Sequence, residues 1–188
     1  GTIVIDSFIE IERVAQVAKA AGKVQKVYVR LTPGVEAHTH EFISTAHEDV
    51  KFGFSIASGA AMQAIENCMA ENSLQLAGVH CHIGSQIFEV DGFTLAAQRL
   101  ISVLAAFHDK FKKELPELNI GGGYGIAYTK LEQAIAPELV MPVIAKTIKS
   151  ECAKHNLEVP KVSIEPGRAI VGPTTTTIYE VGTTKSVT

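Results

Sequence analysis

The sequence has 188 residues, of which 46% are hydrophobic and 6% aromatic, and its formal net charge is −3. This composition is typical of a globular chain and excludes a disordered or collagen-like one. The small negative charge argues against nucleic acid as a partner, and no apolar stretch approaches the roughly 20 residues that a membrane span needs.

The cysteines indicate the cellular compartment, and the first residues indicate where the chain starts relative to its domain. Cys68, Cys81 and Cys152 are odd in number and include no Cys-x-x-Cys pair, which argues against a disulfide framework or a structural zinc site. We therefore expect a cytoplasmic protein. The sequence opens directly on an apolar strand pattern without a secretory signal, which suggests that it starts within a domain.

Hydrophobic periodicity predicts strands alternating with helices. A β-branched run predicts the first strand over 2–5, and Ser7 with Glu10 forms a capping-box pattern that begins a helix over 8–21. Pro142 is expected in the first turn of the last long helix, where its missing N–H costs little. Further strands are predicted over 26–31, 76–81, 118–120 and 161–164, and further helices from Ser58, over 95–115 and over 140–155. A β-branched tail over 174–181 predicts one more strand.

Five strand-to-helix units of this length indicate an α/β fold with a parallel sheet. A doubly wound sheet could be complete with five or six strands, whereas a (β/α)₈ barrel needs eight and about 250 residues. Polar clusters follow several different strands, and barrel active sites are built at such positions. We therefore predict part of a TIM (β/α)₈ barrel over residues 1–172, followed by a strand segment over 173–188 that leads toward a separate β domain.

The first polar cluster is Gly-Val-His-Cys-His-Ile-Gly-Ser-Gln over 78–86, at the end of a predicted strand. The period of two places His80 and His82 on one face. Such a pair could be half of a metal site, but a structural role is equally frequent. Gly84 and Ser85 add a flexible backbone and a hydroxyl, which suit an oxyanion such as phosphate better than a metal.

Two further clusters also follow predicted strands. The run Asn-Ile-Gly-Gly-Gly-Tyr-Gly over 119–125 lacks Cβ atoms where backbone N–H groups could close on a phosphate. A sharp loop is the alternative, but three consecutive glycines between an apolar strand and a polar loop favour the phosphate site. The run lacks the Gly-Lys-Ser/Thr of a Walker loop. Ser-Ile-Glu-Pro-Gly-Arg over 163–168 places Glu165 and Arg168 around a rigid turn, where they could face one pocket or pair with each other.

Together these clusters resemble the fold-type III pyridoxal-phosphate decarboxylases. The motifs that carry the resemblance are His-Ile-Gly-Ser-Gln over 82–86, Gly-Gly-Gly-Tyr-Gly over 121–125 and Glu-Pro-Gly-Arg over 165–168. The stretch over 29–40, continued by Lys-Phe-Gly-Phe over 51–54, is similar to the diaminopimelate branch of that family. The resemblance covers essentially the whole chain and implies an alanine racemase-like barrel that converts meso-diaminopimelate to L-lysine and CO₂.

The resemblance also implies a cofactor, pyridoxal 5′-phosphate, and the residues that bind it. His82 would stack on the pyridine ring, Ser85 and the amides of Gly122 and Gly123 would hold the phosphate, and Glu165 would bond the ring nitrogen. A carboxylate at that nitrogen keeps it protonated and strengthens the ring as an electron sink. The related alanine racemase has an arginine there instead. His82 and Glu165 are accordingly the expected catalytic residues.

The turn after Glu165 completes the expected site. Pro166 and Gly167 would contact the cofactor, and Arg168 would contact its phosphate or the carboxylate of an amino-acid substrate, for which a guanidinium fork is suited. Arg30 resembles the family's arginine near the ring. No metal is expected.

Some of the family's functional segments do not occur in the 188 residues. The upstream lysine motif that anchors the cofactor covalently, the downstream Cys-Glu-Ser segment that reaches across a dimer and the residues that select the substrate's distal end are not found. We therefore expect a homodimer for the full-length protein and no decarboxylase activity from residues 1–188 alone.

Several alternatives remain open at this point. The substrate could be another diamino acid of the arginine or ornithine type, the fold could be a metal-dependent barrel hydrolase that uses His80 and His82, or the chain could be a binding module without catalysis. A loop cluster of His38, His40 and His47 could suggest a metal, and Lys51 a covalent anchor. We expect no metal at the former and a solvated or ion-paired side chain at the latter.

Overall fold

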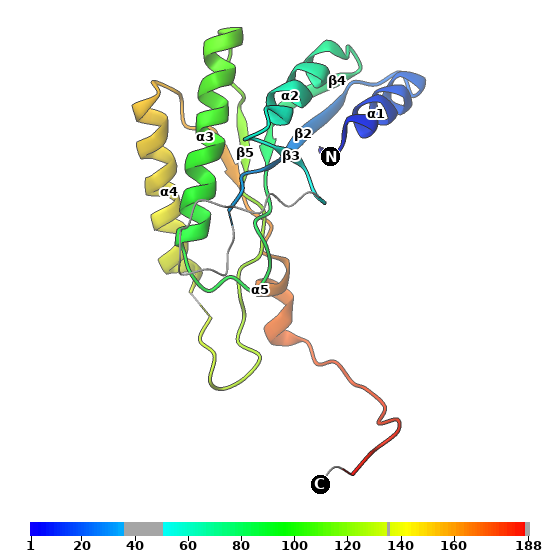
Figure 1. The fold of residues 1–188 in the computed structure, drawn as a ribbon, viewed down its shortest axis with the longest axis vertical. Coiled ribbons are helices and arrows are strands. Elements are labelled where there is room, and N and C mark those ends of the chain that lie inside the picture. Colours follow the sequence, from blue (N-terminus) through cyan, green and yellow to red (C-terminus); the bar gives the residue numbers. More distant parts are fainter. Residues whose placement is uncertain (36–50, 135, 187–188) are drawn as a thin grey trace.

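The computed structural model describes residues 1–35, 51–134 and 136–186. Strands and helices alternate along the chain (Figure 1). The strands are β1 (Ile3–Ile5), β2 (Gln25–Thr32), β3 (Phe54–Ser55), β4 (Leu74–His80), β5 (Glu117–Asn119) and β6 (Lys161–Ser163). The helices are α1 (Phe8–Ala20), α2 (Ala60–Ala70), α3 (Asp91–Phe111), α4 (Pro137–Lys154) and the short α5 (Gly167–Val171), which continues into a 3₁₀ turn at Gly172–Thr174.

The main sheet has the strand order β1-β2-β4-β5-β6, and every neighbouring pair is parallel. Successive strands therefore lie side by side in chain order, as they do around a (β/α) barrel, whereas a doubly wound sheet reverses direction at a switch point. The prediction of a parallel α/β fold is confirmed. The two-residue strand β3, which pairs with the end of β2, was not predicted.

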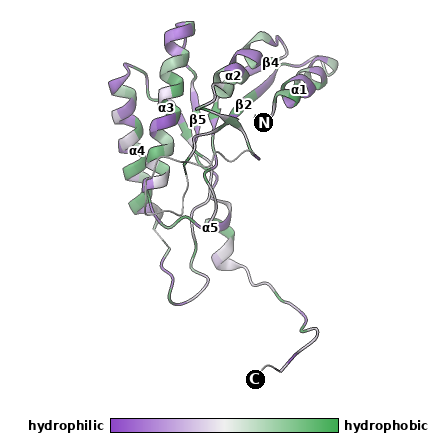
Figure 2. Cartoon of the chain, in the orientation of Figure 1, coloured by the Kyte–Doolittle hydropathy of each residue, from purple (hydrophilic) through white to green (hydrophobic). Residues whose placement is uncertain are grey.

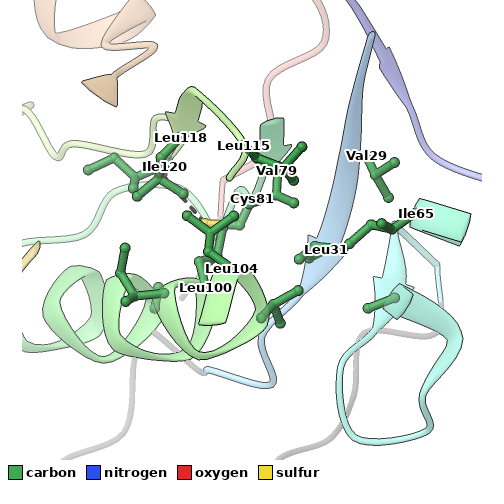
Figure 3. Packing of buried hydrophobic residues seen from close by; sticks show 14 of the residues in the cluster. Val29, Leu31, Ile65, Val79, Cys81, Leu100, Leu104, Leu115, Leu118 and Ile120 are labelled. Carbon is green, nitrogen blue, oxygen red and sulfur yellow. Dashed lines mark hydrogen bonds between the residues drawn. The ribbon is translucent and has the colours of Figure 1, made fainter. Parts of the chain in front are cut away.

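One face of the sheet packs against the helices and forms the hydrophobic core. Alternate strand residues such as Val29 and Val79 are fully buried on this face. Leu100 and Leu104 of α3 lie over Cys81 and the end of β5 (Figure 3). Hydrophobic and hydrophilic residues alternate around the helices, as expected for helices with one buried side (Figure 2). This packing fixes the register of the strands.

The opposite face of the sheet is polar. Tyr28 donates a hydrogen bond to the Glu117 carboxylate, which also pairs with the ammonium group of Lys26. Burial, followed by the Glu117 hydrogen bond, raises the pKa of Tyr28 to about 12. Gly78 lies between Tyr28 and Glu117 in the strand register. Its missing side chain matters because a Cβ there would be 1.9 Å from the backbone oxygen of Glu117.

The last long helix begins earlier than predicted. α4 starts at Pro137, so Pro142 lies inside the helix and not in its first turn. Pro137 occupies the early position in which a missing N–H is harmless. The sequence pattern contains both prolines, but the apolar periodicity becomes evident only at Val140, which is buried.

The strand predicted over 174–181 is not formed in this structure. Residues 175–186 have no regular secondary structure, and this segment extends away from the sheet (Figure 1). A β-branched sequence needs a partner strand to complete its hydrogen bonds, and none of the described strands pairs with it. The expected histidine cluster at His38, His40 and His47 lies outside the described residues. No helix in the described part of the chain is long and apolar enough to cross a membrane.

Candidate active site

Three loops meet at the carboxyl ends of β4, β5 and β6. They are the histidine loop (residues 81–88), the glycine loop (residues 120–126) and the glutamate turn (residues 164–167). The N–H of Cys81 donates to Asn119 O at 3.0 Å, and the N–H of Glu165 donates to Gly121 O at 2.8 Å. The parallel sheet thus continues beyond its strands and brings the three predicted motifs to one edge.

The three consecutive glycines at 121–123 are required for this close approach. A Cβ on the first would lie 2.1 Å from Cys81 O, on the second 2.1 Å from Glu165 O, and on the third 2.2 Å from Gly84 O. The first and third also have positive φ angles of 71° and 104°. The obstacles are backbone atoms of the neighbouring loops, so the glycines are needed for the assembly of the site whether or not a ligand is bound.

The carboxylate of Glu165 accepts hydrogen bonds from two sides. Asn119 Nδ2 donates to its Oε1 at 2.8 Å, and His80 Nε2 lies 3.3 Å from its Oε2. Asn119 Oδ1 in turn accepts from the N–H of Gly121 at 2.8 Å, which fixes the amide orientation. The His80 side chain is only 5% exposed, whereas that of Glu165 is 48% exposed. Buried neutral donors therefore orient a carboxylate that a ligand can reach.

The two histidines have different environments. Burial lowers the pKa of His80 below its ordinary value of 6.5, against the opposing charge of Glu165. Burial and then the positive charge of Arg30 lower the pKa of His82. Both rings are therefore neutral at pH 7. His82 Nδ1 accepts from the N–H of Gly122 at 3.3 Å, so its proton is on Nε2.

The proposed metal role of these histidines has no support in the geometry. His80 uses its Nε2 on Glu165, and His82 uses its Nδ1 on a backbone amide. Across residues 1–35, 51–134 and 136–186, no group of three His, Cys, Asp or Glu side chains is arranged to hold a metal ion.

Arg30 lies at the end of β2, directly beside His80 in the strand register. Its guanidinium donates to Asp6 at 3.0 Å and lies 4.6 Å from the centre of the Phe52 ring. The Arg30 side chain is 20% exposed. The ion pair and the aromatic contact hold a positive charge next to the two histidines, as the effect on the pKa of His82 indicates.

Glu165 and Arg168 do not form the ion pair that the sequence left open. Glu165 pairs with His80 and Asn119, and the Arg168 guanidinium lies 6.0 Å from the ring centre of Tyr128. Gly167 begins α5 and donates its N–H to Glu165 O at 2.9 Å, which closes the turn around Pro166. Arg168 is exposed on this helix, and Ser85 is exposed on the histidine loop.

Sequence reasoning missed the contacts of Asn119 and Gln86, and for His80 it weighed a metal ligand against an unspecified structural role. Asn119 lies two residues before Gly121, and His80 lies two residues before His82. Side chains in a strand alternate with a period of two, so each lies on the same face of the sheet as the motif residue that follows it. That alternation was a usable signal. Gln86 stands inside the histidine motif, but its partner Ile126 is 40 residues away and no local pattern indicates it.

Comparison with known proteins identifies the class. Residues 1–172 match the family described as "Pyridoxal-dependent decarboxylase, pyridoxal binding domain". The chain belongs to this family of pyridoxal-dependent decarboxylases, and its sheet is part of an alanine racemase-like barrel.

Relatives with known names narrow the similarity to one enzyme. The chain is 49% identical over 187 residues to diaminopimelate decarboxylase of Corynebacterium efficiens, 51% identical over 191 residues to that of Mycobacterium tuberculosis and 42% identical over 187 residues to that of Bacillus subtilis. Each alignment covers 100% of this chain but only 41% to 43% of the relative. The crystal structure of diaminopimelate decarboxylase from m. jannaschii in co-complex with L-lysine is similar to this chain with a TM-score of 0.79 at 31% identity, over 90% of this chain and 38% of that one.

The residues at the site fit pyridoxal phosphate. The cofactor has an aromatic ring with a basic nitrogen and a dianionic phosphate, so a site for it offers a polar partner for the nitrogen, a flat partner for the ring and donors for the phosphate, and a carboxylate is the partner that keeps the nitrogen protonated. The accessible Glu165 carboxylate and the neutral, exposed His82 ring meet the first two needs. The Ser85 hydroxyl is exposed beside the glycine loop and is a candidate for the third.

Proposed function

We propose that the full-length protein decarboxylates meso-diaminopimelate to L-lysine and CO₂, and that this chain supplies much of its pyridoxal-phosphate site. The chain spans about two-fifths of the length of its named relatives, so the activity of the whole protein is an inference. The observation that carries it is the reachable Glu165 carboxylate, oriented by His80 and Asn119 at the shared edge with His82. The names of the relatives support the choice of substrate.

Glu165 would hold a proton on the pyridine nitrogen. Its two neutral donors leave the carboxylate as the acceptor for that proton and fix its direction. When bound, the cofactor supplies the electron sink that accepts the electron pair released by loss of CO₂. His82 would cover one side of the ring, because the Gly122 amide fixes the orientation of its imidazole.

The phosphate would be held at the junction of the histidine and glycine loops. Ser85 and the N–H groups of Gly122 and Gly123 are the candidate donors, and Arg168, with Pro166 and Gly167 in the same turn, is the candidate for the phosphate or the substrate carboxylate. In this structure the Gly122 N–H donates to His82 Nδ1 at 3.3 Å, so this amide would have to exchange or share that acceptor to bind a phosphate. The Arg168 side chain is exposed and lies against Tyr128, from which it can turn toward a ligand.

The quaternary and domain organisation follows as part of the same proposal. We infer a homodimer for the full-length protein, an amino-acid substrate, and a cytoplasmic location. Residues 1–172 would form part of the cofactor-binding barrel, and residues 173–188 would lead toward a β domain.

Replacing Glu165 tests the proposed function. In the full-length protein, Glu165→Gln keeps the size and both hydrogen-bond partners within reach but removes the negative charge. We expect pyridoxal phosphate to remain bound while CO₂ release from diaminopimelate falls by a factor of about 10² or more. Glu12→Gln, on the exposed side of α1, is the matched control and should retain full activity. Wild-type turnover in Glu165→Gln would remove this carboxylate from the reaction.

A further inference from the structure

Gln86 ties the histidine loop to the glycine loop with its side chain. Its Nε2 donates to Ile126 O at 2.9 Å, and its Oε1 accepts from Ile126 N–H at 3.0 Å. A primary side-chain amide presents an N–H donor and a C=O acceptor on one edge, which matches the N–H and C=O that one residue of an extended segment presents on one side. Gln86 therefore pairs with the backbone of Ile126 as a neighbouring strand would.

This pair extends a short parallel ladder between the two loops. Ile87 N–H donates to Gly123 O at 2.9 Å, and Gly125 N–H donates to Ile87 O at 2.9 Å. Ile87 and Tyr124 form an isolated parallel bridge at the same place. The two hydrogen bonds of Gln86 add a further step to the ladder, so four bonds in all join the loops on this side of the site.

The backbone of Gln86 is held in an unusual conformation. Its φ angle is 58°, in the left-handed region that residues other than glycine rarely occupy. The histidine loop thus adopts an unfavourable conformation at the residue that makes the reciprocal contact. Such conformations persist where surrounding contacts over-determine them.

We propose that Gln86 is a positioning residue for the phosphate-binding half of the site, in that it holds Ser85 against the N–H groups of the glycine loop. This inference rests on the proposed function. Ser85 precedes Gln86 directly, so the two hydrogen bonds between Gln86 and Ile126 determine the position of the Ser85 hydroxyl. Glu165, which would bind the ring nitrogen, has separate supports, because His80 and Asn119 hold its carboxylate.

The two halves can be probed separately with two ligands. Pyridoxal phosphate engages both halves, whereas pyridoxal has the same ring without the phosphate. In the full-length protein, Gln86→Leu removes both hydrogen bonds to the Ile126 backbone at similar side-chain size, and Gln86→Asn keeps the amide but shortens its reach. Dissociation constants for both ligands would be measured by absorbance or fluorescence titration.

We expect Gln86→Leu and Gln86→Asn to weaken pyridoxal phosphate about tenfold, the equivalent of one misaligned hydrogen bond to a charged group, and to change pyridoxal less than about twofold. Gln98→Leu, on the exposed side of α3, is the control and should leave both constants unchanged. Equal weakening of the two ligands, or no change in either, would overturn the inference. If the wild-type protein binds pyridoxal phosphate no better than pyridoxal, the proposed function is refuted instead. The preference of the wild-type site for the phosphorylated ligand is measured without any substitution, so this outcome is distinct from the behaviour of the Gln86 variants.

Discussion

Replacing His80 should separate the activity of the site from its stability. The His80 side chain is 5% exposed, and its Nε2 lies 3.3 Å from Glu165 Oε2. Its Nδ1 is buried and has no hydrogen-bond partner among the described residues. A leucine at this position removes the contact to Glu165 and also the unpaired nitrogen, at a similar volume.

The expected magnitudes follow from these contacts. A hydrogen bond to a charged group contributes about 1.5–3 kcal/mol, and the half-exposed Glu165 places this one at the low end. A buried unsatisfied polar atom costs about 1–3 kcal/mol, so its removal offsets the loss. We therefore expect the free energy of unfolding of His80→Leu to stay within about 1 kcal/mol of the wild type. Turnover should fall about tenfold, because about 1.4 kcal/mol of lost orientation in the transition state corresponds to that factor.

The assay compares three full-length proteins. CO₂ release at saturating diaminopimelate and pyridoxal phosphate gives kcat, and thermal unfolding gives Tm. His80→Gln is the control, since its amide Nε2 can replace the imidazole Nε2 as donor and should recover most of the turnover. If His80→Leu has the wild-type kcat, or if His80→Gln is impaired as strongly as His80→Leu, then His80 does not act by orienting Glu165.

Two further predictions concern stability. Gly78→Ala should lower the free energy of unfolding by about 3 kcal/mol or more in urea denaturation, because its Cβ would lie 1.9 Å from Glu117 O, which the pairing of β4 with β5 holds in place. Gly182 has open space around it, so Gly182→Ala is the control and should have no effect. An equal urea midpoint for the two variants would contradict the strand register. The stability should also fall as the pH drops below 6.5, because the pKa values of His80 and His82 are lowered in the folded state and the unfolded chain takes up protons first. His80 contributes at most about 1.4 kcal/mol per pH unit, so unfolding measured from pH 7.5 to 5 should show a shallower dependence in His80→Leu, and identical slopes would contradict the prediction.

The sequence by itself determined the architecture and the position of the site. β-branched runs alternating with amphipathic helices require parallel strands, and parallel strands place their carboxyl ends at one edge. The motifs that contain His82, Gly122 and Glu165 each follow a strand, so their convergence could be predicted before any contact was known. These signals are local in the chain and depend only on periodicity.

The tertiary structure decided what holds those residues in place. Glu165 is oriented by His80 and Asn119, which precede it by 85 and 46 residues, and Gln86 pairs with Ile126 across 40 residues. The tail over 174–181 has strand-forming residues but no partner strand among those described. In each case the outcome depends on which atoms of a distant segment lie opposite a residue. That is fixed by the register of β4, β5 and β6, and the register depends on the packing of the sheet against its helices in one shared core, which no local pattern encodes.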